Sequence, residues 1–257
     1  VKDLCKSFAG ITAARNINVE AGAGEIIGII GANGAGKTVF VIMITGYLKP
    51  TSGTIEFFGK DITGIEPRDA AHVGVCRSFQ VSQVFMSMTV RENLAIALAI
   101  ARDDGRAMLK APGRPEIRAE GERLMRQFTI FEHRDAVAGA LSQGVRKLLD
   151  IAMAVVSNPK VLLLDEPTAG VSVEEKFAIM DIVIVAMKEK GATVLFVEHD
   201  MEIVERYVDR VLAFYQGEVI CDAPPAEALK DPAVIEYVIG SGRAPTPTAA
   251  AGSPSHA

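Results

Sequence analysis

The sequence predicts an α/β fold, with a mostly parallel β-sheet, an N-terminal antiparallel β part and an inserted α-helical subdomain. Two observations predict it. Strand-like apolar segments alternate with helical patterns in the first and last thirds of the chain. Such alternation is typical of a parallel sheet covered by helices. Between about residues 84 and 158 the pattern is helical throughout, which indicates a separate helical subdomain.

The N-terminal third supplies strands and one buried helix. The segment Gly31–Thr38 is rich in small residues, and the helix Val39–Thr45 that follows is apolar on every face. A helix of that kind is expected to be buried all round. Strands are predicted at Val1–Cys5, Ile17–Glu20, Glu25–Ile30, Gly53–Gly59 and Val73–Phe79.

The middle third is helical. Thr89 and Glu92 have the spacing of a capping box and predict the start of a helix over residues 90–102. Further helices are predicted over residues 116–128 and 144–156. The segment Asp103–Pro115 contains glycines and prolines and is predicted to be a loop.

The last third returns to alternating elements. Ser172 and Glu175 predict a second capping box, for a helix that runs to Lys190 and stops at Gly191. A hairpin is expected to turn near Gln216–Gly217. The remaining predictions are strands at residues 161–164 and 193–198, a helix at 201–207 and two short helices ending near 239.

The predicted domain therefore spans residues 1–240, with a core of residues 1–83 and 159–240 and the helical subdomain at about 84–158. Residues 241–257 are small and polar and are predicted to form a disordered tail. The chain begins at Val1 without a methionine, so a short N-terminal piece is expected to precede it.

Composition excludes some classes of function. The net charge is −5, and no run of Lys or Arg could track a phosphate backbone, which argues against a nucleic-acid partner. The three cysteines are scattered and indicate neither a metal nor a redox motif. No apolar stretch approaches the ~20 residues that a bilayer span requires. A cytoplasmic chain without a membrane span is the expectation.

The glycine-rich segment Gly31–Thr38 predicts a phosphate-binding loop. Backbone N–H groups of a glycine turn, followed by a helix N-terminus, are suited to hold a triphosphate. Lys37 would reach the β and γ phosphates, and the Thr38 hydroxyl would bind Mg²⁺. The predicted ATP-binding residues here are Gly31, Ala32, Asn33, Gly34, Ala35, Gly36, Lys37, Thr38 and Val39.

Two carboxylates end the apolar strand Val161–Leu164. In parallel sheets, ligands bind at the carboxyl ends of strands, where Asp165 and Glu166 lie. Asp165 is predicted to hold Mg²⁺ through water, and Glu166 to orient the water that attacks the γ phosphate. As isolated residues, the two acids would also fit a solvated strand end.

The order of these pieces resembles the ATP-binding-cassette (ABC) family over residues 1–240. The segment Leu141–Val145 (Leu-Ser-Gln-Gly-Val) is similar to the family's signature, Gln80 to its Q-loop glutamine and His199 to its switch histidine. Phe8 lies where relatives carry the aromatic residue that stacks on adenine. A structural histidine, a core phenylalanine and a plain helix cap at Ser142 are the alternatives for these residues.

The resemblance implies an ATPase that uses ATP and Mg²⁺. Glu166, His199 and Gln80 are then catalytic, and Thr38, Gln80 and Asp165 bind the metal. It also implies a second ATPase chain, identical or different. Ser142 and Gly144 would act in trans, on the nucleotide held by that partner.

Three positions depart from the family pattern. Gln143 replaces the first signature glycine, Val145 replaces the glutamine, and Ser172 replaces the usual aspartate of the D-loop. Because valine cannot complete a capping box with Ser142, we expect a helix cap weaker by up to ~1 kcal/mol. Ser172 is interpreted chiefly as a helix N-cap.

Several segments resemble the ATPase subunits of branched-chain amino-acid importers and their urea or amide relatives: residues 77–80, 148–154, 198–201 and 231–240. A peripheral location on the inner face of the cell membrane follows. Residues 81–93 are predicted to contact the transmembrane permease, with Phe85, Met86 and Met88 as an apolar socket or as ordinary packing. The alternatives are an ABC ATPase acting on ribosomes or DNA, a GTPase switch and an inactive binding module.

Overall fold

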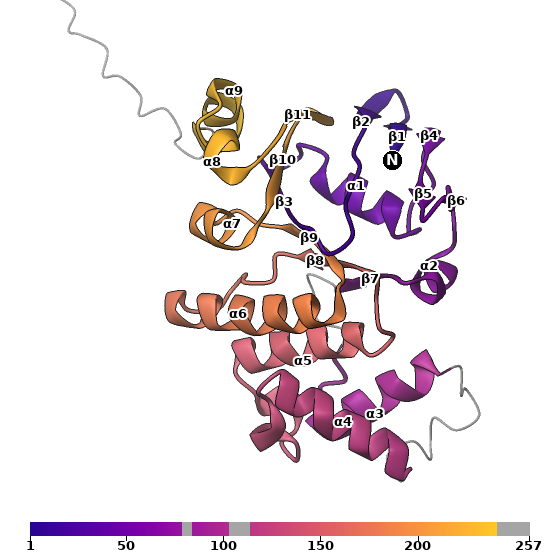
Figure 1. The fold of residues 1–257 in the computed structure, drawn as a ribbon, viewed down its shortest axis with the longest axis vertical. Coiled ribbons are helices and arrows are strands. Elements are labelled where there is room, and N and C mark those ends of the chain that lie inside the picture. Colours follow the sequence, from indigo (N-terminus) through magenta and orange to yellow (C-terminus); the bar gives the residue numbers. More distant parts are fainter. Residues whose placement is uncertain (79–83, 103–113, 241–257) are drawn as a thin grey trace, which may run out of the picture.

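The computed structural model describes residues 1–78, 84–102 and 114–240. A six-stranded sheet with the strand order β11-β10-β3-β9-β8-β7 forms its centre (Figure 1). The strands from β10 to β7 are parallel, and β11 pairs with β10 in the antiparallel sense. These strands are β3 (Ile26–Gly31), β7 (Val75–Ser78), β8 (Val161–Asp165), β9 (Thr193–Val197), β10 (Arg210–Tyr215) and β11 (Glu218–Ala223).

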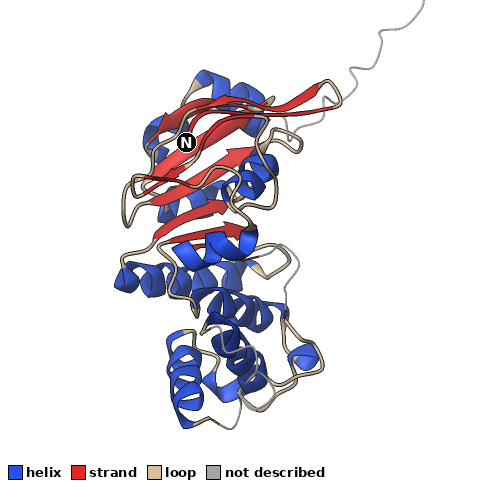
Figure 2. Cartoon of the chain, turned by 90° about the vertical axis from the view of Figure 1, so that its right-hand side faces the viewer, coloured by secondary structure: helices blue, strands red, loops and turns tan. Residues whose placement is uncertain are grey.

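Both faces of this sheet are buried, which explains why its central strands are apolar without alternation. In β3, Ile26 and Ile30 belong to one hydrophobic core, and Ile27 and Ile29 belong to a second core on the other face. The first core includes residues of the helices α3 (Val90–Ala101) to α7 (Met201–Tyr207), and the second includes residues of α1 (Lys37–Ile44) and of the N-terminal strands. Figure 2 shows helices on either side of the strands.

The N-terminal strands β1 (Lys2–Phe8), β2 (Ile11–Ile17) and β4 (Ser52–Thr54) form an antiparallel sheet, and β5 (Glu56–Phe57) pairs with β6 (Lys60–Asp61). Two predictions are wrong here. The strand expected at residues 17–20 ends at Ile17 instead. The single strand expected at residues 53–59 is divided, because β4 pairs with β1 whereas β5 pairs with β6. Phe58 and Gly59, both with positive φ (48° and 76°), form the turn from β5 to β6.

Helix α2 (Pro67–Val73) was not predicted, although proline at its first position and Gly74 after its end are a recognisable pair of signals. The other helices follow the predicted pattern within a few residues. They are α1 (Lys37–Ile44), α3 (Val90–Ala101), α4 (Pro115–Gln127), α5 (Gln143–Val155), α6 (Val173–Lys190), α7 (Met201–Tyr207), α8 (Pro225–Ala228) and α9 (Pro232–Val234), the last continued by a π-helical turn at Ile235–Ile239.

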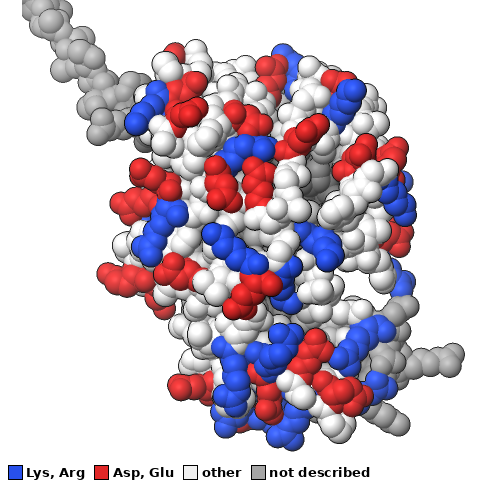
Figure 3. Space-filling model, viewed as in Figure 1, with Lys and Arg blue, Asp and Glu red and all other residues white. Residues whose placement is uncertain are grey.

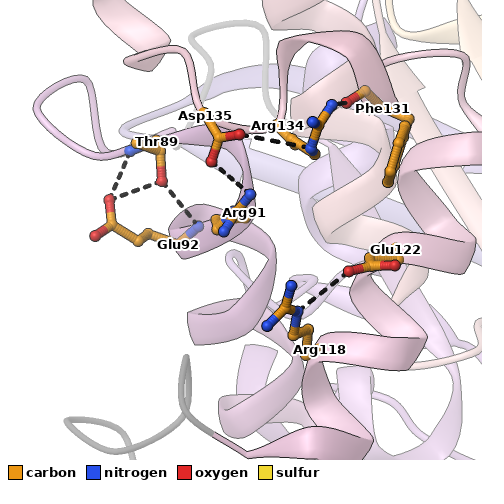
Figure 4. Close-up of polar contacts among 8 residues, drawn as sticks. All are labelled: Thr89, Arg91, Glu92, Arg118, Glu122, Phe131, Arg134 and Asp135. Carbon is orange, nitrogen blue, oxygen red and sulfur yellow. Dashed lines mark hydrogen bonds and ion pairs between the residues drawn. The ribbon is translucent and has the colours of Figure 1, made fainter.

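Both predicted capping boxes are confirmed. Figure 4 shows the first: the Thr89 N–H donates to the Glu92 carboxylate (2.8 Å), and the Glu92 N–H donates to the Thr89 hydroxyl (3.3 Å). Ser172 and Glu175 exchange the same two bonds at the start of α6. The helix ends at Gly191, which has a left-handed conformation.

The predicted fold class is confirmed. Helices α3, α4 and α5 lie together at one end of the molecule (Figure 1). The subdomain boundaries at residues 84 and 158 stay a prediction, and the predicted tail, most of the predicted loop 103–115 and Gln80 lie outside the described residues. Acidic and basic side chains are interspersed on the face in Figure 3. Among the described helices, none combines the length and apolar character needed to cross a membrane.

Candidate functional site

Four neighbouring parallel strands, β3, β9, β8 and β7, end at one edge of the sheet, and predicted site residues follow each of these ends. The glycine-rich segment Gly31–Thr38 follows β3, His199 follows β9, and Asp165 and Glu166 end β8. Gln80 follows β7 but lies outside the described residues. The topology therefore brings together residues that are far apart in the chain.

The glycine-rich turn leads into the start of α1. Gly36 has φ 104°, and a Cβ atom there would lie 2.8 Å from the carbonyl oxygen of Ala13, so only glycine fits. No side chain caps α1. Because the first N–H groups of a helix have no partner within it, this end of α1 is suited to bind an anion.

Lys37 is the cation of the turn. Its side chain is buried, and its ammonium group donates to the carbonyl oxygens of Gly31 (2.5 Å) and Ala32 (3.0 Å). Burial lowers the pKa of Lys37, while the charges of Glu166 and Asp165 act to raise it. The ammonium group thus lies over the turn, bound to its carbonyl oxygens.

Asp165 and Glu166 differ in their surroundings. Asp165 is 4% exposed, and its Oδ2 atom is bound by the Arg77 guanidinium of β7 at 2.6 Å. Glu166 has φ 47°, a sparsely populated conformation for this residue type that turns the chain sharply after the strand. Its carboxylate lies 3.3 Å from His199 Nε2, so the two predicted catalytic side chains are in contact.

Arg77, Thr168 and Glu198 complete this edge of the sheet and were not predicted as site residues. The buried Glu198 carboxylate accepts hydrogen bonds from the Thr168 N–H (3.2 Å) and hydroxyl (2.5 Å), and from the His199 N–H (3.1 Å). Arg77 and Glu198 are charged residues inside or directly after an apolar strand. That position is a signal that sequence reasoning could have used.

Helix α5 adds further charges beside these acids. Lys147 and Asp150 are both buried on it. Burial lowers the pKa of Lys147, and the charges of Asp150, Asp165, Glu198 and Glu166 act in the opposite direction. The buried acids at the strand ends are therefore balanced in part by a cation from the helical part of the chain.

Ser142 caps α5, as expected. Its hydroxyl accepts the Val145 N–H at 3.4 Å, and the helix has no capping box. The Gln143 amide donates to the carbonyl oxygen of Ala169 at 3.2 Å, which ties α5 to the loop after Glu166. Within the described part of the chain, no hydrogen bond or ion pair joins Ser142 or Gly144 to the turn before α1.

Phe8 lies at the end of β1 with 45% of its surface exposed, and the Lys6 ammonium group lies 5.1 Å from the centroid of its ring. The alternative that Phe8 is a core aromatic residue is therefore wrong. Its proposed stacking on adenine stays a prediction. In the same region Asn33 and Thr38 are exposed, and Val39 is half-buried.

A groove of about 850 Å³ lies between α2, β7, α3 and α5, and Phe85 and Arg77 are among the residues that line it. Phe85 and Met86 are exposed beside it, whereas Met88 is half-buried. The buried Asn93 holds their loop by hydrogen bonds to the backbone of Phe85, in both directions, and to the carbonyl oxygen of Thr89. Residues 81–83 of the predicted permease contact lie outside the described residues.

Comparisons with known proteins agree with this arrangement. Residues 14–169 match the family model described as ABC transporter. The chain is 34% identical over 248 residues to the high-affinity branched-chain amino acid transport ATP-binding protein LivG of Salmonella typhimurium, covering 93% of this chain and 96% of the relative. It is 33% identical to a probable branched-chain amino acid transport ATP-binding protein LivG of Methanocaldococcus jannaschii, with the same coverage.

Solved structures are similar as well. The ADP conformation of an ATP-binding cassette of an ABC transporter has a TM-score of 0.83 and 32% identity, and the match covers 94% of this chain and 97% of that one. A nucleotide-free ATP-binding cassette from an ABC transporter has a TM-score of 0.82 with 32% identity, over 91% of this chain and 96% of that one.

Proposed function

The chain belongs to the ABC transporter family, and from that premise we propose that it is the ATP-hydrolysing subunit of a membrane importer for branched-chain or related amino acids or amides. The observation that supports this most strongly is the meeting of Lys37, Asp165, Glu166 and His199 at one edge of the parallel sheet. Because the similar relatives are named as transport proteins, a role on ribosomes or DNA is not favoured.

ATP binds with its phosphates on the turn Gly31–Thr38. The uncapped start of α1 donates backbone N–H groups, and Lys37 supplies a positive charge at the β and γ phosphates. The exposed ring of Phe8 stacks on the adenine base.

Mg²⁺ fits the oxygen donors that this edge offers. A magnesium ion is usually held by one or two carboxylates together with substrate phosphates. We assign it to the Thr38 hydroxyl, to Asp165 and to Gln80. The Arg77 guanidinium binds Asp165 Oδ2, which fixes the rotamer of the carboxylate. When bound, the ion neutralises charge on the phosphates.

Glu166 orients the water that attacks the γ phosphate, and His199 contacts that phosphate. Phosphoryl transfer depends mainly on positioning and on electrostatic stabilisation, and less on covalent chemistry by the protein. The contact of 3.3 Å between the His199 ring and the Glu166 carboxylate suits this division of roles, because each side chain limits the rotamers of the other.

A second ATPase chain, identical or different, completes the site. Ser142 and Gly144 at the start of α5 close over the nucleotide of that partner, through backbone N–H groups and the helix dipole. The partner chain contacts the γ phosphate only in the closed pair, so ATP favours closure and hydrolysis reopens it.

The permease contacts residues 81–93 and the groove beside them. Exposed Phe85 and Met86 on a loop held by Asn93 form the apolar part of this surface. Through this contact the chain is held on the inner face of the cell membrane.

ATP hydrolysis by the purified protein with Mg²⁺ tests the function, and Glu166→Gln tests the mechanism. We expect Glu166→Gln to remove hydrolysis and to accumulate an ATP-bound dimer, measured by light scattering after size exclusion. Glu205→Gln, which changes an exposed acid on α7, is the matched control. A wild-type protein without Mg²⁺-dependent hydrolysis would contradict the function, and a monomeric Glu166→Gln protein at saturating ATP would contradict the pairing.

A further inference from the structure

Glu198 is a buried carboxylate with no role in the proposed reaction. It is 4% exposed and lies between the end of β9 and His199. Its Oε1 atom accepts from both the N–H and the hydroxyl of Thr168, and its Oε2 atom accepts from the N–H of His199. One side chain therefore joins the loop after Glu166 to the backbone of the neighbouring histidine.

Two further contacts join the chain at Glu166 to the end of β9, and the contacts of Glu198 lie between them. On one side, the Glu166 N–H donates to the carbonyl oxygen of Val197 at 3.0 Å. On the other, the Glu166 carboxylate contacts His199 Nε2 at 3.3 Å. Three successive residues, Val197, Glu198 and His199, thus hold the loop that carries Glu166. The side chain of Glu198 supplies the middle contact.

A carboxylate is costly at this place. Asp165 and Glu166 lie close by, and burying like charges together raises the free energy of the folded state. Lys147 on α5 offsets part of this cost, since its charge interacts with all three acids.

The hydrogen-bonding pattern accounts for the residue type. Three donors, the N–H and hydroxyl of Thr168 and the N–H of His199, point at this side chain. Only an ionised carboxylate presents two acceptor oxygens, whereas an amide of the same shape presents one acceptor and one donor group.

We propose that Glu198 is a positioning residue for ATP hydrolysis, which sets the spacing between Glu166 and His199 by holding Thr168 and the His199 backbone together. This inference rests on the proposed function, because it concerns the water-orienting acid and the phosphate-contacting histidine of that reaction. Glu198 touches neither the phosphate turn nor α1 among its described contacts, so its effect is confined to the hydrolytic step.

Thr168→Val removes the hydroxyl and keeps the shape of the side chain. Steady-state hydrolysis is expected to show a roughly ten- to hundredfold lower kcat, because small displacements of reacting groups have effects of this size. The KM for ATP should stay unchanged, since the phosphate turn is intact. Thr168→Ser restores the hydroxyl and should return kcat close to the wild-type value.

Thr193→Val is the matched control. Thr193 is also a buried threonine, at the opposite end of β9, and its hydroxyl donates to the Gly22 carbonyl oxygen (2.8 Å) and accepts from the Gly24 N–H (3.0 Å). Both valine variants should lose similar thermal stability, but only Thr168→Val should lose kcat. Equal losses of kcat in the two variants, or no rescue by serine, would overturn the proposal in favour of a structural role.

Glu198→Gln tests the carboxylate itself. With one acceptor oxygen in place of two, we expect a lower kcat with an unchanged KM. Combined with Thr168→Val, it should add little to the loss, because both changes break the same link. A wild-type protein that does not hydrolyse ATP would contradict the proposed function together with this inference. An active wild type whose Thr168→Val and Glu198→Gln variants keep full kcat would contradict this inference alone.

Discussion

The starts of α1 and α5 are two helix N-termini that we assign to phosphate, and they are built differently. The start of α1 has no side-chain cap, and it carries the buried Lys37 behind the left-handed Gly36. The start of α5 is capped by its own Ser142, whose hydroxyl accepts the Val145 N–H, and Ser142 and Gln143 are exposed.

The difference indicates which of the two can act alone. At α1 the donors and the cation come from one chain, and the turn is held in place by the protein core. At α5 one donor already has a partner in Ser142, and the nearest cation, Arg146, donates to the carbonyl oxygen of Leu141 at 2.9 Å. We therefore expect α1 to bind nucleotide within a single chain and α5 to contribute only when a second chain supplies the nucleotide.

Of the predicted changes, removal of the cation at the start of α1 should have the largest effect. Lys37→Ala is expected to weaken ATP binding by at least about 100-fold, because the lost contact is a charge-assisted hydrogen bond to phosphate. Isothermal titration measures the ATP affinity, with the exposed Lys60→Ala as control. Unchanged affinity in Lys37→Ala would show that the turn before α1 is not the main phosphate site.

The pH dependence of binding follows from the same lysine. Since burial lowers the pKa of Lys37, its charge is lost at a lower pH than that of an ordinary lysine. ATP affinity should therefore fall as the pH rises on the alkaline side. Isothermal titration at increasing pH measures this fall in affinity.

Adding a methyl group at the start of α1 and at the start of α5 should separate effects on stability from effects on dimerisation. Gly36→Ala places a Cβ atom 2.8 Å from a backbone oxygen at φ 104°, so we expect a loss of about 1–3 kcal/mol in the free energy of unfolding. Gly144→Ala meets side chains and no backbone atom: a Glu175 carboxylate oxygen at 3.2 Å and Ile179 at 3.5 Å. It also gains up to about 1 kcal/mol of helix propensity.

Two measurements, denaturant unfolding and ATP-dependent dimerisation, therefore distinguish these two changes. Gly36→Ala should lower stability. Gly144→Ala should keep stability and weaken dimerisation of the Glu166→Gln protein. Full dimerisation by Gly144→Ala would remove the start of α5 from the partner contact.

Removing the cap of α5 should have a smaller effect. Ser142→Ala is expected to lower the free energy of unfolding by about 1 kcal/mol and to weaken pairing. Ser172→Ala at the start of α6 is the matched variant, and it breaks a complete capping box. We expect Ser172→Ala to cost more stability than Ser142→Ala. The reverse order in thermal or denaturant unfolding would contradict the weak cap assigned to α5.

Completing the cap should have the smallest effect. Val145→Gln supplies the missing capping-box partner, for a gain of up to ~1 kcal/mol. Part of the gain is lost, because Val145 packs against the adjacent hydrophobic core. ATP-dependent pairing and the ATPase rate should rise slightly. If both stay unchanged, the departure at this position has no bearing on the partner contact.

Features that depend on neighbouring residues could be predicted from the sequence. The capping boxes at Thr89 and Ser172 join residues three apart, and the turn Gly31–Thr38 is a continuous segment. Where local signals were ambiguous, the prediction was wrong in position. The strand expected at residues 17–20 lies at 11–17 instead, because pairing with β1 decides its register.

Contacts between distant residues were not predictable in this way. Arg77 and Asp165 are 88 residues apart, and Thr168 and Glu198 are 30 apart. Each pair meets because β7, β8 and β9 are neighbours in the sheet, a strand order that no single segment encodes. Arg77 and Glu198 were noticed only as parts of family-like segments, and their roles at the site came from their partners.

By itself, the sequence determined the fold class, the phosphate turn, the acids at the end of a buried strand and the helix caps, because each arises from local hydrogen bonding and side-chain chemistry. The tertiary structure alone decided that Glu166 faces His199, that Arg77 holds Asp165 and that Glu198 joins two loops. The physical reason is that parallel strands bring their carboxyl ends to one edge, and the order in which they do so depends on the packing of the whole core.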